Sequence, residues 1–155
     1  MEAIPLLQFA ETLCDQNSDQ AYETIANIHF CISSVLSILR DFERVKWHCE
    51  KNLEMRLSAP EQDDMHLSIA YNDMGFYYLC VNLFEEALSA FQMSLNTSSK
   101  LEISKNGTYL AVNPKINSAT ALLGLGRFEE ADEMVSRCLE QQERTWGVMN
   151  TRSFA

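Results

Sequence analysis

The sequence predicts an all-α protein in which similar helix pairs stack on one another. Apolar residues recur at steps of three and four along most of the 155-residue chain, and only three prolines and five glycines occur. One short line also appears three times: FERVKWHCEKNL from Phe42, FEEALSAFQMSL from Phe84 and FEEADEMVSRCL from Phe128. Self-similarity at a period of about 20 to 50 residues is typical of repeat arrays, because one unit buries its apolar face only against the next.

An N-terminal helix is expected over residues 2–16, because apolar residues recur there at helical spacing (Leu6, Leu7, Ala10, Leu13). Three helix pairs follow, and each ends in the repeated line. The pairs are expected at about 20–57, 62–98 and 109–145, as helices 20–39 and 41–57, 62–81 and 84–98, and 109–124 and 127–145. Residues 146–155 are expected to form a C-terminal tail, so that residues 1–155 make up a single domain.

Glycine and proline mark the expected connections, with one exception. Five of them lie where connections between helices are expected: Pro60, Pro114, Gly107, Gly126 and Gly147. Gly75 instead lies inside a periodic segment, and Ser33 and Ala119 take its place in the other two copies. A small residue there is expected to let the two helices of a pair approach closely, which offsets the cost of about 1 kcal/mol for glycine in a helix.

Composition excludes several classes of protein. The net charge of −10 would repel a phosphate backbone, so nucleic acid is not an expected partner. The chain has no signal peptide pattern and no run of 18 apolar residues, which predicts a cytoplasmic protein that does not span a membrane. Five scattered cysteines without a CxxC pair fit reduced thiols in such a compartment.

The aligned positions resemble the tetratricopeptide repeat. The second copy carries the pattern in Gly75, Tyr78, Phe84, Ala87, Phe91 and Leu95, and the third in Ala119, Leu122, Gly126, Phe128, Ala131 and Leu139. The family's usual period is about 34 residues. The periods of 42 and 44 here are similar to the long-linker variety of kinesin light chains and of many predicted fungal proteins. The first copy departs from the pattern with Arg40 at the turn and with Val45 and Asn52 in place of alanines.

The resemblance implies a right-handed α-α superhelix of about three helix pairs plus an N-terminal helix, in which the first helix of each pair lines a concave groove. The implied groove residues are Asn27, Phe30, Cys31 and Ser34, then Ile69, Asn72, Asp73, Phe76 and Leu79, then Asn113, Ile116, Asn117, Thr120 and Leu123. That many of them are ordinary helix-packing residues remains open. Asn72 and Asp73 stand where the kinesin-type repeats carry paired asparagines, which suit the backbone of an extended peptide.

The expected function is that of a protein-interaction module or scaffold that binds a peptide or partner protein in the groove. No Lys or Arg stands at the positions that grip acidic tails in relatives of this kind, so a neutral, apolar or basic segment is the expected ligand. The alternative is a small-molecule-binding or catalytic accessory protein of a biosynthetic pathway, with a pocket around Phe30, Asn72, Phe76 and Ile116. The two ends look unfinished, which predicts self-association end to end.

Catalysis is the less favoured alternative, and neither a metal nor a cofactor is expected. Groups that transfer protons crowd one helix (His66, Tyr71, Asp73, Tyr77, Tyr78), but their spacing divides them between different faces. His48 and Cys49 are adjacent on a helix and therefore point about 100° apart. His29 and Cys31 lack a third ligand at a zinc spacing.

Overall fold

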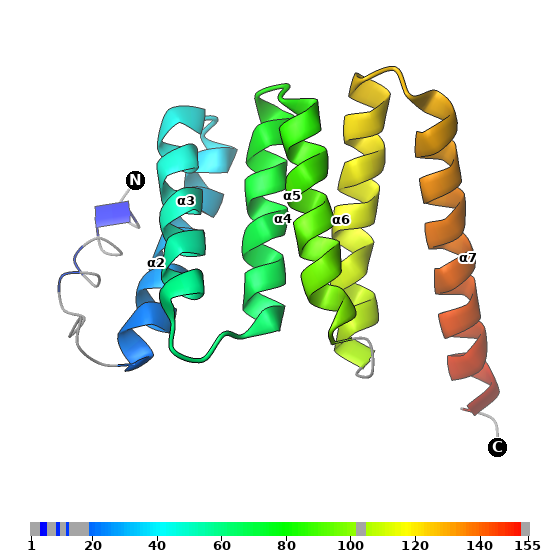
Figure 1. The fold of residues 1–155 in the computed structure, drawn as a ribbon, viewed down its shortest axis with the longest axis horizontal. Coiled ribbons are helices and arrows are strands. Elements are labelled where there is room, and N and C mark those ends of the chain that lie inside the picture. Colours follow the sequence, from blue (N-terminus) through cyan, green and yellow to red (C-terminus); the bar gives the residue numbers. More distant parts are fainter. Residues whose placement is uncertain (1–3, 6–8, 10–11, 13–18, 102–104, 153–155) are drawn as a thin grey trace.

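The computed structural model describes residues 4–5, 9, 12, 19–101 and 105–152 and, within the two long stretches, the side chains of 21–101 and 112–144. These residues form helices without any strand (Figure 1). The helices are α2 (Asp19–Ile38), α3 (Phe42–Ser58), α4 (Asp64–Cys80), α5 (Phe84–Ser99), α6 (Lys105–Gly124) and α7 (Phe128–Arg152). The all-α prediction is confirmed, and the bounds of α2 to α5 agree with the expected ones to within two residues.

Consecutive helices pack against each other along the whole described chain. α2 packs on α3, α4 on α5, and α6 on α7, and α3–α4 and α5–α6 contacts join one pair to the next. α4 also contacts α6, so the first helices of the second and third pairs are neighbours. Figure 1 shows the helices as a row that runs from α2 and α3 at one end to α7 at the other.

The turn within each pair has the same geometry three times. Arg40, Asn82 and Gly126 each adopt a left-handed φ, of 58°, 61° and 74°, and each lies two residues before the repeated phenylalanine. The N–H of the next residue returns to the first helix in all three cases: Asp41 to Leu36 O, Leu83 to Tyr78 O and Arg127 to Leu122 O, at 3.0, 2.9 and 2.9 Å. These are the long hydrogen bonds of a Schellman helix end. The sequence repeat is therefore also a repeat of backbone conformation.

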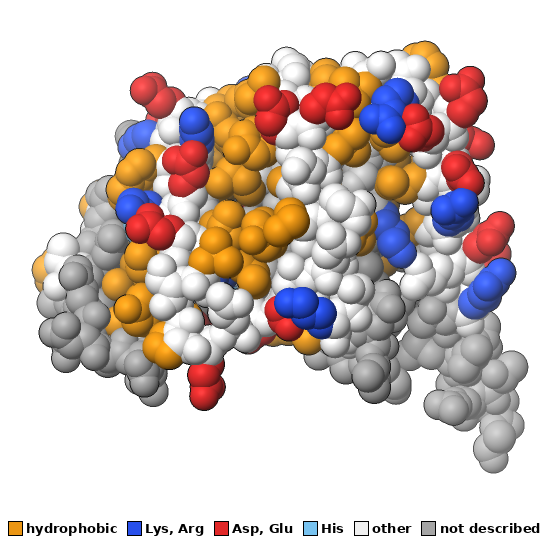
Figure 2. All heavy atoms as spheres, viewed as in Figure 1, with side chains coloured by type: hydrophobic (Ala, Val, Ile, Leu, Met, Phe, Trp, Pro, Cys, Tyr) orange, Lys and Arg blue, Asp and Glu red, His pale blue; other side chains and the backbone are white. Residues whose placement is uncertain are grey.

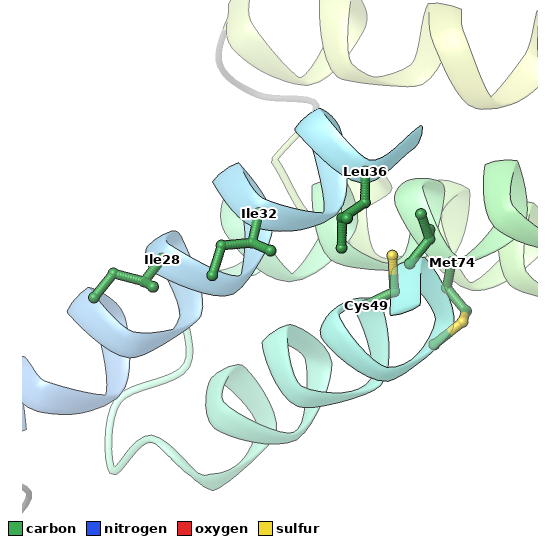
Figure 3. Close-up of a cluster of buried hydrophobic side chains, with 6 residues drawn as sticks. Ile28, Ile32, Leu36, Cys49 and Met74 are labelled. Atoms are coloured by element: carbon green, nitrogen blue, oxygen red, sulfur yellow. The ribbon is translucent and has the colours of Figure 1, made fainter. Parts of the chain in front are cut away.

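The hydrophobic core consists of clusters that tie each pair to its neighbour. Ile28, Ile32 and Leu36 lie in a row along α2 and face α3, as Figure 3 shows. Met74 of α4 belongs to that cluster, although it comes from the next pair. Ala121 of α6 likewise completes a second cluster around Phe91 of α5. Because the clusters cross pair boundaries, each pair buries its apolar face partly against its neighbour.

Two glycines allow close helix contacts. A Cβ atom on Gly75 would lie 2.5 Å from Cε1 of Phe91, a distance that real Cβ atoms essentially never show, so the predicted close approach of α4 and α5 is confirmed. The sequence did not predict the second case. A Cβ atom on Gly124 would lie 2.5 Å from Cε1 of Phe84, which packs the end of α6 onto the start of α5.

The expected connections near the C-terminal end were partly wrong. α6 begins at Lys105, so Gly107 and Pro114 lie inside it, and α7 continues to Arg152 through Gly147, so residues 146–152 are helical and not a tail. Pro114 is fully buried, and its carbonyl oxygen accepts a hydrogen bond from Ser118 Oγ at 2.7 Å. Packing thus offsets the backbone hydrogen bond that proline cannot donate.

The predictions for the two ends fall largely outside the described residues. Of the expected helix over 2–16, the structure describes only residues 4, 5, 9 and 12, among which Ile4 packs against the cluster around Ile32. At the other end, the side chains of residues 145–155, through which self-association is expected, are not described.

The surface carries both apolar and charged regions. Figure 2 shows hydrophobic side chains gathered over α3 and α4 on one face, with acidic and basic side chains along the edge where α5 and α7 begin. None of the described helices combines the length and the apolar character that a bilayer crossing requires.

Candidate functional site

The ten residues chosen as the main groove positions all lie at or near the surface of the first helices. Five are exposed and five are half-buried. The exposed ones are Asn27, Ser34, Phe76, Ile116 and Thr120, and the half-buried ones are Phe30, Ile69, Asn72, Asp73 and Asn117. The buried residues of α4, among them Leu67, Ala70 and Met74, occupy the opposite side of that helix. These positions are therefore available on a face that the core does not use.

The structure joins two of the predicted residues directly. Asn117 Nδ2 of α6 donates a hydrogen bond to Asn72 Oδ1 of α4 at 3.1 Å, across 45 residues of sequence. The bond uses one donor and one acceptor of the two amides. The Asn72 amide also interacts with the Asp73 carboxyl and lowers its pKa, so the second N–H of Asn72 Nδ2 and the Asn117 Oδ1 atom are the groups that could serve a ligand's backbone.

Apolar side chains flank this pair of amides. Phe76 follows Asn72 by one helical turn and is 43% exposed, while Ile116 precedes Asn117 and is 50% exposed. Leu123, two turns beyond Ile116, is 53% exposed. Large apolar side chains at the surface of two contacting helices, with amides between them, form a surface suited to an extended peptide.

The predicted residues of α2 make other contacts. Asn27 Oδ1 accepts a hydrogen bond from Arg56 Nη2 of α3 at 2.9 Å. The Phe30 carbonyl accepts from Ser33 Oγ and from Ser34 Oγ, at 2.8 and 2.9 Å. Among the described residues, no hydrogen bond joins the predicted positions of α2 to those of α4. The α4–α6 part of the face is therefore the part that the structure assembles.

Asp73 is an unusual member of the set. Its Oδ2 atom is buried and, in the described part of the chain, has no hydrogen-bond partner. Burial raises the pKa of Asp73 to about 7, against the lowering effects of the Asn72 amide and the Arg56 charge. The group is thus a carboxyl that titrates near neutrality beside the amide pair.

Arg56 is a residue that the sequence analysis missed. It belongs to a second helix, but its guanidinium extends to the first: Nε donates to Asn52 Oδ1 of its own helix at 2.9 Å, and Nη2 to Asn27. It also lines a cavity of about 530 Å³ at the starts of α2 and α4, together with Tyr22, Glu23, Asp63 and His66. The spacing of Asn52 and Arg56, one turn apart, was the only signal in the sequence.

The cavity differs from the pocket expected for a small molecule. None of Phe30, Asn72, Phe76 and Ile116 lines it. Two of its polar lining residues contact each other, since His66 Nδ1 lies 2.9 Å from Asp63 Oδ2.

The described histidine and cysteine side chains do not come together to form a reactive group. His29 Nδ1 of α2 lies 2.9 Å from His48 Nδ1 of α3 within the pair interface, a contact that the sequence analysis did not consider. Burial raises the pKa of the neighbouring Cys49 thiol to about 12, so Cys49 is not a thiolate at neutral pH. Among the described residues, no three His, Cys, Asp or Glu side chains are grouped to hold a metal ion.

No model of a known protein family matches the chain, and no curated protein matches it significantly.

Proposed function

We propose that this chain is a tetratricopeptide-like helical array that binds an extended segment of a partner protein across the face formed by α4 and α6. In this proposal the three pairs form a right-handed superhelix and the first helices line its concave side. The observation that carries the proposal is the Asn72–Asn117 hydrogen bond between two first helices, flanked by the exposed side chains of Phe76 and Ile116.

The repeat part of the proposal rests on equivalent residues in equivalent environments. The three left-handed turn residues and their return hydrogen bonds recur at aligned positions. Ala87 and Ala131 are both fully or nearly fully buried, as the tetratricopeptide resemblance implies for a small residue that packs against the first helix. Val45, which departs from that pattern, is buried at the same position of the first copy.

The binding part rests on the mixture of groups on the face. Extended peptides present alternating side chains and an unpaired backbone, which require apolar contacts together with donors and acceptors. Phe76 and Ile116 supply the apolar contacts, and the side-chain amides of Asn72 and Asn117 supply the donors and acceptors. A partner of this kind also suits the charge of the chain, which is −10 and favours a neutral or basic segment.

A displayed library of random dodecapeptides, sorted on the folded chain, tests the proposal without knowledge of the natural partner. Selected peptides should lose most of their affinity for the double variant Asn72→Ala, Phe76→Ala. The matched control is Gln92→Ala, Met93→Ala, which removes an exposed amide and a 44% exposed apolar side chain from the second helix α5. Its affinity for the same peptides should equal that of the parent.

Circular dichroism separates binding from folding, since both double variants should retain the helicity of the parent. Peptides that bind the α4 variant as tightly as the parent, or that lose affinity for the α5 control instead, would place the binding surface elsewhere and contradict the proposal.

A further inference from the structure

Asp73 combines features that ordinary packing does not explain. It is the one acidic residue among the ten groove positions, it lies next to Asn72 on α4, and it is half-buried with one fully buried, unpartnered oxygen. A buried acceptor without a donor costs roughly 1 to 3 kcal/mol. This unpartnered oxygen lies at the edge of the surface where we propose that a peptide binds.

The protein's own cations do not satisfy this oxygen. Arg56 is near enough to lower the pKa of Asp73, but two of its nitrogens donate to Asn52 and Asn27. Oδ2 accepts no hydrogen bond from it. The described hydrogen bonds of the guanidinium go to the two amide oxygens, so Oδ2 of Asp73 retains capacity for another donor.

The helix that carries Asp73 and the first helix of the preceding pair, α2, contain acidic but no basic residues. Between Asp19 and Ile38, and between Asp64 and Cys80, the chain contains no Lys or Arg. The same two helices carry four acidic residues: Asp19, Glu23, Asp64 and Asp73. Asp64 is already paired with Lys100, at 2.9 Å, so Asp73 is the acidic residue of α4 that remains for a cationic ligand.

We propose that Asp73 binds the ammonium or guanidinium group of a Lys or Arg side chain in the partner segment. This inference rests on the proposed function, because it specifies the chemistry of the segment that α4 and α6 bind. Asp73 is half-buried as a residue, and binding of the cation requires its side chain to turn so that Oδ2 leaves its buried position. A cation there would favour the ionised form of a carboxyl whose pKa is otherwise raised by burial.

The neighbouring groups suit a basic side chain for two further reasons. Asn72, directly before Asp73, can fix the backbone of the segment, so that the position of the basic residue is defined relative to the amide pair. Phe76, three residues after Asp73, offers an apolar surface for the methylene stem of Lys or Arg. In this arrangement Asn72 binds the backbone of the segment, Phe76 contacts the methylene stem of the basic residue, and Asp73 binds its charged group.

The dodecapeptide library tests this inference with the single variant Asp73→Asn. On the parent, the selected peptides should be enriched in Lys or Arg at one fixed position relative to their apolar residues. Replacement of that residue by norleucine should lower the affinity about ten- to a hundredfold for the parent, the range expected for a charge-assisted hydrogen bond. For Asp73→Asn, the Lys and norleucine peptides should bind equally.

The matched control is Asp132→Asn, which removes an exposed acidic residue from α7 and should leave the preference for Lys over norleucine unchanged. If peptides bind the α4–α6 face without enrichment of a basic residue, or if Asp73→Asn keeps the preference, the inference is wrong while the proposed function stands. If no peptide distinguishes the parent from the Asn72→Ala, Phe76→Ala variant, both are wrong.

Discussion

The helices α5 and α7 begin with the same four residues but have very different surroundings. In α5, Phe84 packs against Gly124 of the next pair, and Phe91 is fully buried against Gly75. The aligned residues of α7 are Phe128, which is 61% exposed, and Val135, which is 41% exposed. In the described structure α5 packs between α4 and α6, whereas α7 packs mainly on α6, with Leu88 of α5 against the cluster that contains Ala131.

This difference shows that neighbours, and not the repeat motif itself, determine burial in this fold. The same phenylalanine is half-buried against the core where a following helix covers it, as at Phe84, and is exposed where none of the described helices does, as at Phe128. Stability in such an array should therefore depend on position along the array more than on residue type. Paired substitutions at aligned positions test this directly.

The largest difference is expected between Phe91→Ala and Val135→Ala. Loss of the fully buried ring should cost about 3 to 5 kcal/mol, because a cavity remains between α4 and α5, whereas the exposed valine should cost less than about 1 kcal/mol. Urea unfolding of both variants measures the two free energies. Equal costs would show that α7 is as well covered as α5 and would remove the basis of the comparison.

The next largest loss of stability is expected at Gly75, where the absence of a Cβ atom leaves room for the ring of Phe91. Gly75→Leu should cost roughly 3 kcal/mol by overpacking, because even the first added carbon would lie 2.5 Å from the ring. Ser33→Ala, at the aligned position of the first pair, should be nearly silent in the same thermal melts. A Gly75→Leu variant that melts with the parent would refute the alignment of the repeats.

Asp73 should make the stability of the parent dependent on pH. The pKa is about 7 in the folded chain and near 3.8 in the unfolded chain, so stability should fall as the pH rises from about 4 to 7 and then level off. Asp73→Asn should equal the parent at pH 4 and exceed it by roughly 4 kcal/mol at pH 8, since each unit of pKa difference corresponds to about 1.4 kcal/mol.

Chemical unfolding of the parent and of Asp73→Asn at pH 4 and pH 8 measures this difference in the free energy of unfolding. Cys49 and Arg56 also face this carboxyl, and neither titrates over the range, since burial raises the pKa of Cys49 to about 12 and Arg56 remains protonated. A pH-independent difference between Asp73→Asn and the parent would mean that the carboxyl is solvated.

The smallest expected changes in stability concern the left-handed residues of the turns within the pairs. Gly126→Ala should cost about 1 kcal/mol through backbone strain alone, since φ is 74° and no atom lies near the added carbon. Arg40 already bears such strain at φ 58°, so Arg40→Gly should be neutral or slightly stabilising. In thermal melts the melting temperature of Gly126→Ala should fall. That of Arg40→Gly should stay the same or rise slightly. A loss of stability in Arg40→Gly would show that the Arg40 side chain outweighs the strain.

Much of the fold could be predicted because periodicity and repetition agree. The aligned aromatic and the small residue before it located α2 to α5 and identified Gly75 as a contact position. The method was wrong where it took Pro114 and Gly147 as helix ends. Burial of Pro114 against other helices is a tertiary effect, which local propensity does not contain.

The candidate site was predictable only as a face. The tetratricopeptide resemblance placed Asn72 and Asn117 on the groove side of their helices, but the bond between them depends on how α4 and α6 pack. Arg56 was missed because only first helices were considered, and a long side chain can reach from one helix to another. The His29–His48 contact likewise depends on the register of α2 against α3, which no spacing within one helix reveals.

The most direct test of the account is a crystal structure of the chain bound to the tightest peptide from the library. The account predicts an extended peptide that contacts Asn72 and Phe76 of α4 and Ile116 of α6, with a basic side chain at Asp73. A peptide seated instead on the outer surfaces of α3 and α5, or one that touches only α7, would contradict the assignment of the first-helix face as the binding surface.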